Sequence, residues 1–254
     1  RVLAHLDTWT ALAEVAVAER YVRPAVDDGF ALTLLGSRHP VIERLMPRED
    51  QVEADDAVPD DIVAAMRELG LFGLTIPEQY GGLGLNVQEE AGVVFELGRT
   101  SLAFRSVIGT TVGIGSQGIV IDGTEKQKLE WLPRLASGEA IASFALTEPE
   151  AGSDAASIST TARLEGNHYR LNGTKRYITN APRAGMFTVM ARTNQEVKGG
   201  AGVSAFLVPS DMKGVSVGKP EKKMGQQGAH ICDVNFDNVR VPEELRLGEE
   251  GQGF

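Results

Sequence analysis

The segment that decides the fold is residues 142–180, which begins ASFALTEPEAGSD at residues 142–154 and ends LNGTKRYITN at residues 171–180. An apolar run enters a loop of small residues and carboxylates. A hairpin is then expected to bring back a second strand that carries a hydroxyl and an aromatic ring. This arrangement of strand, loop and returning strand is the pattern against which the rest of the chain is interpreted.

The chemistry available in this segment suits an aromatic cofactor with a phosphate tail, such as a flavin. The backbone N–H groups of Gly152 and Ser153, with the serine hydroxyl, can bind an anion such as pyrophosphate. Tyr177 offers a flat face for stacking, and Thr147 and Thr179 offer hydroxyl and backbone donors. Taken alone, the loop is explained more simply as a plain turn between strands.

Composition and charge set limits on the class of protein. The chain has 254 residues, enough for one large domain or two modest ones with a real core. Its net charge is −10, whereas phosphate backbones require clustered Lys and Arg, so nucleic-acid binding is not expected. The apolar stretches fall short of the roughly 18 residues that span a bilayer. We therefore expect no membrane span and no signal peptide.

Cysteine and histidine usage argues against a metal or disulfide framework. Cys232 is the only cysteine, so neither an intrachain disulfide nor a cysteine zinc site can form, which favours a reducing compartment. Its alternating surroundings predict a core cysteine rather than a nucleophile. The four histidines are scattered at His5, His39, His168 and His230, and we expect no metal site.

Residues 44–140 are predicted to be mainly helical. A helix starts at Asp60 and stops at Gly70, and Thr124 with Gln127 predicts a capping box at the start of another helix. Residues 101–121 are rich in glycine, serine and threonine, which fits close helix packing or a ligand wall equally well.

After Ile141 the apolar pattern changes to a period of two. Short strands with closely spaced turns, one of them at Asn172-Gly173, predict a small sandwich or barrel over residues 141–254. The expected strands are 141–147, 157–164, 168–172, 176–179, 186–191, 203–208, 214–218 and 230–236.

Residues 1–43 form an extra helix and strand segment with its own resemblance. The runs LAEVAV at 12–17, YVRP at 21–24, VDDG at 26–29 and RHPVIE at 38–43 are similar to the MutS family of DNA mismatch-recognition ATPases. No G-x-x-x-x-G-K-[S/T] phosphate loop occurs in the chain, so ATP cannot be held in that family's way. A gene fusion, a cloning artefact, a chimera or a divergent helical N-terminus would each explain the junction near residues 43–45.

The chain from residue 44 to residue 254 resembles the acyl-CoA dehydrogenase family. The resemblance implies an α+β fold with an N-terminal helical domain (44–140), a β-barrel middle domain (141–254) and a C-terminal four-helix domain, which this sequence lacks. The motifs that carry it are RELGLFGL (67–74), PEQYGGLG (77–84), GTEKQK (123–128), WLP (131–133), ALTEPEAGSD (145–154), LNGTK (171–175), ITN (178–180), KMG (223–225) and FDNVRVP (236–242).

The same resemblance implies FAD as the cofactor. Tyr177 should then pack on the flavin ring, Thr179 should hydrogen-bond near its reactive nitrogen, and Ser153 should meet the pyrophosphate or the CoA moiety of the substrate. The positions implied to contact the cofactor are Phe144, Leu146, Thr147, Gly152, Ser153, Tyr177, Ile178 and Thr179.

The implied reaction belongs to fatty acid metabolism: a carboxylate removes the α-proton of an acyl-CoA thioester while a β-hydride passes to the flavin. That catalytic base lies in the family's C-terminal domain, so we assign no catalytic residue here. Glu148 and Asp154 are expected to support the loop. The chain alone is expected to be inactive or nearly so and to bind FAD weakly or not at all, because a general base must lie within reach of its proton.

The resemblance also implies partners and a compartment. An electron-transfer flavoprotein would accept the electrons, the intact enzyme would be a homo-oligomer, and the compartment would be the bacterial cytoplasm or the mitochondrial matrix. Two alternatives stay open: a non-catalytic structural relative, and a DNA-repair-associated module carried by residues 1–43.

Overall fold

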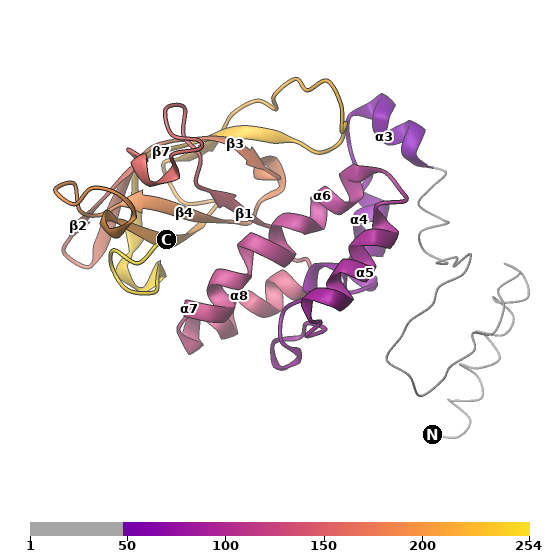
Figure 1. Ribbon diagram of the computed structural model, residues 1–254, viewed down its shortest axis with the longest axis horizontal. Coiled ribbons are helices and arrows are strands. Elements are labelled where there is room, and N and C mark those ends of the chain that lie inside the picture. Colours follow the sequence, from indigo (N-terminus) through magenta and orange to yellow (C-terminus); the bar gives the residue numbers. More distant parts are fainter. Residues whose placement is uncertain (1–47) are drawn as a thin grey trace, which may run out of the picture.

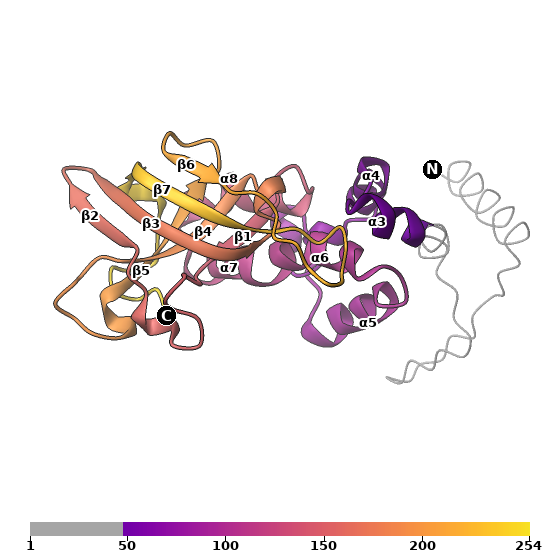
Figure 2. The same cartoon turned by 90° about the horizontal axis from the view of Figure 1, so that it is seen from above.

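The computed structural model describes residues 48–254 (Figure 1). The segment predicted at residues 1–43, and the MutS resemblance with it, lie outside the described residues. The helices within residues 49–110 lie at one end of the molecule, whereas those within residues 117–136 lie against the strands, which occupy the other end (Figures 1 and 2). The first strand, β1 (Ala142–Ala145), contacts both helices and strands. The segment 142–180 therefore starts where the two parts meet.

The helical part matches the predicted arrangement closely. Thr124 and Gln127 form the expected capping box, with the Gln127 amide 3.2 Å from Thr124 Oγ1 and the Thr124 amide 2.9 Å from Gln127 Oε1. A second capping box, at Asn86 and Glu89, was not predicted. The helices are α3 (Glu49–Asp55), α4 (Asp60–Glu68), α5 (Val87–Leu97), α6 (Leu102–Thr110), α7 (Gln117–Asp122) and α8 (Glu125–Ala136).

Between α6 and α7 lies a π-helical turn, Thr111–Gly115, that packs tightly against the first strand. The Ala142 amide donates to Thr111 Oγ1 over 3.1 Å. A Cβ atom built at Gly115 would lie 2.4 Å from the Ala142 Cβ atom. The small residues of this segment thus allow a close approach of helix and strand.

The strands of the described residues form one eight-stranded sheet in the order β6-β7-β3-β2-β4-β5-β8, with β1 paired parallel to β4 off this path. The chain is therefore α+β, as predicted. The strands are β1 (Ala142–Ala145), β2 (Thr161–Glu165), β3 (His168–Thr179), β4 (Met186–Arg192), β5 (Val203–Pro209), β6 (Val215–Val217), β7 (Ile231–Pro242) and β8 (Arg246–Leu247).

The predicted barrel is wrong, because the sheet is open. Closure would require β6 and β8 to pair, but these end strands have only three and two residues. Backbone carbonyls at the β8 edge are instead paired by a side chain of helix α8. Gln127 Nε2 donates to the Glu244 and Arg246 carbonyls at 2.8 and 2.9 Å. A helix side chain thus covers backbone acceptors that a neighbouring strand would otherwise need to pair.

The turn predicted at Asn172-Gly173 is also wrong, because the chain continues through it as one strand. β3 pairs antiparallel with β7, and the register shifts between Leu171 and Gly173. Gly173 has a φ of 154°, and a Cβ atom there would lie 2.4 Å from Thr160 Oγ1. Gly173 therefore lies in a β-bulge, where its lack of a side chain allows the close approach of Thr160, and not in a hairpin turn.

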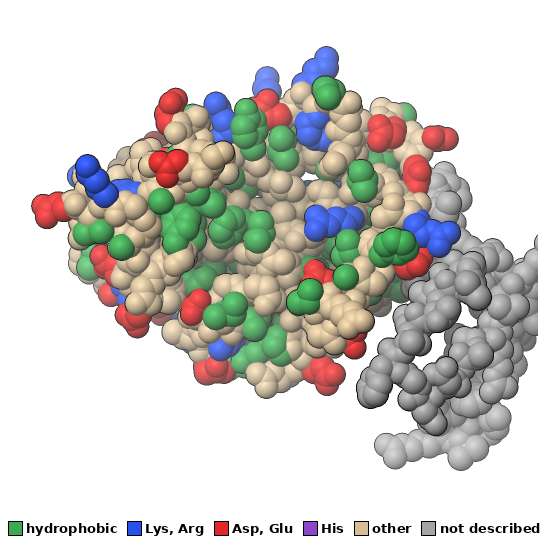
Figure 3. All heavy atoms as spheres, in the orientation of Figure 1, with side chains coloured by type: hydrophobic (Ala, Val, Ile, Leu, Met, Phe, Trp, Pro, Cys, Tyr) green, Lys and Arg blue, Asp and Glu red, His purple; other side chains and the backbone are tan. Residues whose placement is uncertain are grey.

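Buried side chains form a cluster among the helices, one in the sheet and one between the two parts. Cys232 is fully buried in the sheet cluster, which confirms its prediction as a core residue. On the face shown in Figure 3, basic and acidic side chains are interspersed. Within residues 48–254, no helix combines the length and the apolar character needed to cross a membrane.

The two glycines of the π-helical turn should respond differently to alanine. Gly115→Ala should destabilise the protein by about 1–3 kcal/mol, because the added methyl group overpacks the contact with Ala142. Gly113→Ala is the matched control, since a Cβ atom there meets nothing within 4 Å. That variant should be neutral or stabilising by up to about 1 kcal/mol. Urea denaturation measures both, and equal effects would contradict the close contact.

Candidate functional site

Strand β1 and the end of β3 lie side by side, so the two halves of the segment 142–180 meet. Ser143 Oγ donates to the Thr179 carbonyl at 2.7 Å. The Arg176 amide donates to the Thr147 carbonyl at 2.8 Å. The structure therefore brings Thr147 next to the part of β3 that carries Tyr177 and Thr179.

A buried ion pair fixes this junction. Lys175 Nζ lies 2.8 Å from Glu148 Oε1, and the two side chains are 0% and 2% exposed. The ammonium group also donates to the Leu146 carbonyl at 3.0 Å. The Glu148 carboxylate accepts from the amides of Ser159 and Thr160 at 2.6 and 2.9 Å, and from Ser159 Oγ at 2.7 Å. One carboxylate thus ties β1 to both β3 and the start of β2.

Both members of the pair are charged at neutral pH. Burial raises the pKa of Glu148, but the hydrogen bonds from Lys175, Thr160 and Ser159 outweigh it and lower the pKa from 4.5 to about 2. Burial lowers the pKa of Lys175 from 10.5 to about 8, against the opposing hydrogen bond and charge of Glu148. The expected loop-supporting role of Glu148 is confirmed, and its lysine partner was not predicted.

Directly after Lys175, a β-bulge turns an aromatic ring outward. Regular alternation would bury Tyr177, because Lys175 points inward and Arg176 outward. The register with β7 instead shifts between Lys175 and Ile178, and Tyr177 takes a left-handed φ of 58°. Tyr177 stays 56% exposed, with the Arg176 guanidinium 5.8 Å from its ring centre, while Ile178 enters the sheet core. Ile178 therefore offers only its backbone to a ligand.

Beside Thr179 lies a hollow of about 470 Å³. The Asn180 side chain holds one wall in place, because its Nδ2 donates to the Ser106 carbonyl at 2.7 Å and to Thr110 Oγ1 at 2.8 Å. Sequence reasoning missed most of the lining, although the small residues of 101–121 and the KMG motif pointed to two of its segments. The lining residues are Ser106, Thr179, Lys223, Met224, Gly225, Gln226, Ala229 and Ile231.

Of the eight predicted contact positions, only Thr179 lines this hollow. Phe144 and Leu146 are half-buried and pack against the core between helices and sheet, whereas Gly152 and Ser153 lie on an exposed turn. That turn begins at a two-residue bridge between Glu148 and Ala151.

The chain beyond the exposed turn is held by side chains. Asp154 accepts a hydrogen bond from the Ser157 hydroxyl, which confirms its loop-supporting role. Arg192 donates to the Ala156 and Ile158 carbonyls at 2.7 and 3.1 Å. Among residues 48–254, no group of three or more metal-ligating side chains is placed to hold a metal ion.

Comparison with known proteins assigns both parts of the chain to one family. Residues 37–139 match the acyl-CoA dehydrogenase N-terminal domain, and residues 143–239 match the acyl-CoA dehydrogenase middle domain. The boundary between the two matches falls at the start of β1, where the helical and sheet parts meet.

Individual relatives agree with this assignment. An acyl-CoA dehydrogenase of Bacillus subtilis is 39% identical over 212 residues, which cover 84% of this chain and 56% of the relative. The structure of an acyl-CoA dehydrogenase from Bacillus anthracis complexed with FAD has a TM-score of 0.76 at 39% identity, covering 84% of this chain and 36% of that one. Butyryl-CoA dehydrogenase from Megasphaera elsdenii has a TM-score of 0.79 at 30% identity, covering 87% and 62%. The chain thus spans only part of each relative.

Removing the buried cation should be costly. Lys175→Met should destabilise the protein by about 3–5 kcal/mol, because Glu148 is left charged and buried without its partner. Glu165→Gln is the matched control, since it breaks a pair between β2 and β3 whose side chains are 41–42% exposed. It should cost at most about 1 kcal/mol. Chemical denaturation compares the two, and similar losses would show that Glu148 is not the anchor.

The ion pair should also make the free energy of unfolding fall at low pH. Because the pKa of Glu148 is lowered in the folded protein, its contribution is complete above pH 4.5 and is lost as the pH falls towards 2. The loss should reach about 3 kcal/mol, which follows from the size of the shift. Urea midpoints measured between these pH values should fall less steeply for Glu148→Gln than for the parent or for Glu165→Gln. A parent protein whose stability is flat over this window would contradict the shift.

Proposed function

We propose, because this chain belongs to the acyl-CoA dehydrogenase family, that residues 142–180 form one wall of an FAD site in an oxidoreductase acting on acyl-CoA. The observation that carries the proposal is the exposed Tyr177, which lies on β3 two residues before Thr179, a lining residue of the hollow. An aromatic residue in a left-handed conformation is unfavourable, and such strain tends to be kept at functional sites. Here the ion pair of Lys175 and Glu148 holds the neighbouring backbone that imposes it.

The available donors fit a flavin. The Thr179 side chain lines the hollow, and no hydrogen bond to its hydroxyl is made among residues 48–254. That hydroxyl is free to donate to a ring nitrogen, while the Tyr177 face can stack on the ring. The turn at Gly152 and Ser153 presents backbone N–H groups to solvent and suits the pyrophosphate or a CoA phosphate. Phe144, Leu146, Thr147 and Ile178 would contribute mainly their backbone and flanking surface.

Bound FAD would supply the hydride acceptor for α,β-desaturation of the thioester. The chain's own residues would bind and orient the ring and exclude water from one side of it. Of the described residues that line the hollow, none is a carboxylate. We therefore propose that residues 48–254 alone do not complete the reaction, because proton removal needs a base in reach.

The remaining partners rest on the family. We propose an acyl-CoA thioester as substrate, an electron-transfer flavoprotein as acceptor and a homo-oligomer for the intact enzyme. The compartment, bacterial cytoplasm or mitochondrial matrix, stays a prediction. A non-catalytic relative with the same fold is the competing proposal, and flavin binding separates the two.

Flavin binding should depend on the outward face of β3. In a fluorescence titration of FAD with the purified chain, Tyr177→Ala should weaken binding about fivefold to tenfold through loss of the stacking face. Thr179→Val, which keeps the shape of the side chain, should weaken it by a similar factor. Leu164→Ala is the control, because Leu164 is 52% exposed, close to the 56% of Tyr177, but lies on β2 away from the hollow.

Two outcomes would contradict this proposal. Equal losses for Leu164→Ala and Tyr177→Ala would mean that FAD does not use this wall. An intact enzyme that shows no flavin absorption when purified gently would favour the non-catalytic relative, whereas weak binding by this chain alone is expected.

A further inference from the structure

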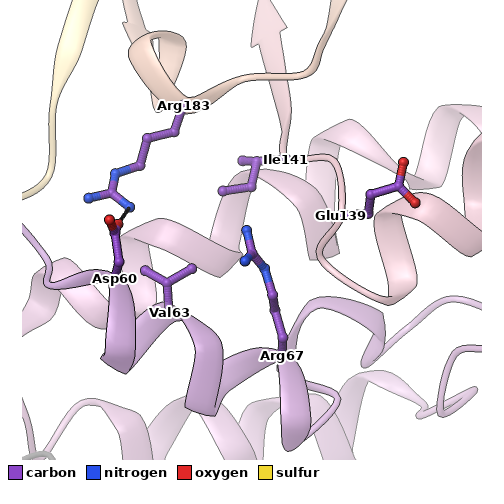
Figure 4. Close-up of a pocket in the computed structure, with 6 residues that line it drawn as sticks. All are labelled: Asp60, Val63, Arg67, Glu139, Ile141 and Arg183. Carbon is purple, nitrogen blue, oxygen red and sulfur yellow. Dashed lines mark ion pairs between the residues drawn. The ribbon is translucent and has the colours of Figure 1, made fainter.

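A second cavity, of about 450 Å³, lies where α4 meets the sheet and shares no lining residue with the hollow at Thr179. Its walls come from the helical part, from the start of β1 and from the short 3-10 turn Ala181–Arg183. The residues that line it are Asp60, Val63, Arg67, Glu139, Ile141 and Arg183 (Figure 4). Nothing in the proposed flavin chemistry uses these side chains.

The cavity combines two guanidinium groups and two carboxylates with a small apolar floor. Val63 and Ile141 are 3% and 5% exposed and belong to the helical core, so the floor is rigid. Figure 4 shows Arg67 rising from α4 into the middle of the space, while Arg183 comes from the opposite wall and points its guanidinium at Asp60. Two cations facing one apolar floor are the features of a site for a small, partly apolar anion.

Arg67 is held in position for such a role. Its Nε donates to the Gly138 carbonyl at 2.9 Å, which leaves the two terminal nitrogens directed away from that bond. Gly138 has a φ of 71°, and a Cβ atom there would lie 2.8 Å from the Arg67 Cγ atom. The glycine thus allows the arginine stem to pack closely, and the fork is ordered before any ligand arrives.

The carboxylates that line the cavity leave Arg67 unneutralised. Glu139 is paired with Arg134 at 2.8 Å, outside the cavity. Asp60 is 99% exposed and lies 3.5 Å from Arg183. Among residues 48–254, no carboxylate lies within 4 Å of the Arg67 guanidinium. Arg183 also donates to the Val58 carbonyl at 2.7 Å, so it too is fixed in place.

We propose that this cavity binds a small organic anion, with a carboxylate or phosphate head group held between Arg67 and Arg183 and a compact apolar body resting on Val63 and Ile141. Both head groups match the planar fork of arginine. Asp60 competes with the ligand for Arg183 and thereby limits its affinity. The proposal is independent of the flavin wall, because the two sites share no residue.

Calorimetric titration of the full chain with three ligands that share a benzene ring tests the proposal. Phenyl phosphate and benzoate carry the two anionic head groups, and benzamide is the neutral control of similar shape. At least one anion should bind at one equivalent with a Kd of about 1 mM or tighter. Benzamide should bind at least about tenfold more weakly, and the anion that binds tighter identifies the preferred head group.

Variants locate the binding. Arg67→Gln should weaken anion binding by about tenfold or more, because a charge-assisted hydrogen bond is lost. Asp60→Asn should tighten it severalfold, since it releases Arg183, and should leave folding intact, because the Asp60 carboxylate is exposed. Ser153→Ala and Arg163→Gln are controls for the flavin loop and for net charge, and both should leave the affinity unchanged.

The proposal is overturned if benzamide binds as well as the anions, if neither anion binds, or if Asp60→Asn leaves the affinity unchanged. Loss of binding in Ser153→Ala would place the anion on the exposed turn instead. An Arg67→Gln variant that binds normally would reduce Arg67 to a tether between α4 and Gly138.

Discussion

The architecture around the proposed flavin wall depends on one buried charge pair. Glu148 and Lys175 are 27 residues apart, and removal of either one would leave the other as an uncompensated buried charge. The carboxylate also caps two amides at the start of β2, so three chain segments share a single anchor. A buried pair of this kind contributes little net stability but strongly penalises any arrangement that separates its members. It therefore fixes which parts of the segment meet.

The β-bulge after Lys175 determines which side chain next to this ion pair is exposed. With Lys175 fixed inward, the shifted register decides that Ile178 fills the core and Tyr177 faces out. A strand with unbroken alternation would bury the aromatic ring and expose the isoleucine. The arrangement of the wall thus follows from where the extra residue is placed rather than from the side chains alone.

Local signals in the sequence predicted local structure well. The capping box at Thr124 and the buried Cys232 follow from spacing and alternation, and both are present. Features decided by distant contacts were not accessible in this way. Asn172-Gly173 has the composition of a turn, but pairing with β7 carries the strand through it. The prediction of a barrel was wrong for a similar reason, since Gln127 of α8 donates a hydrogen bond to a backbone carbonyl at the edge of the sheet. The hollow at Thr179 combines three segments far apart in the chain, whose meeting no local pattern indicates.

The two sides of that hollow differ in how firmly they are built. On the helix side, the Asn180 side-chain amide donates hydrogen bonds to Ser106 and Thr110 of α6. On the other side, the chain at 223–226 is braced mainly by its own Lys223, whose ammonium bonds two nearby carbonyls, and Met224 is fully exposed. A bulkier ligand would therefore be accommodated by movement of residues 223–226. Because only residues 223–226 would move, the hollow could bind ligands of different size while β3, the strand proposed to face the flavin, keeps its position.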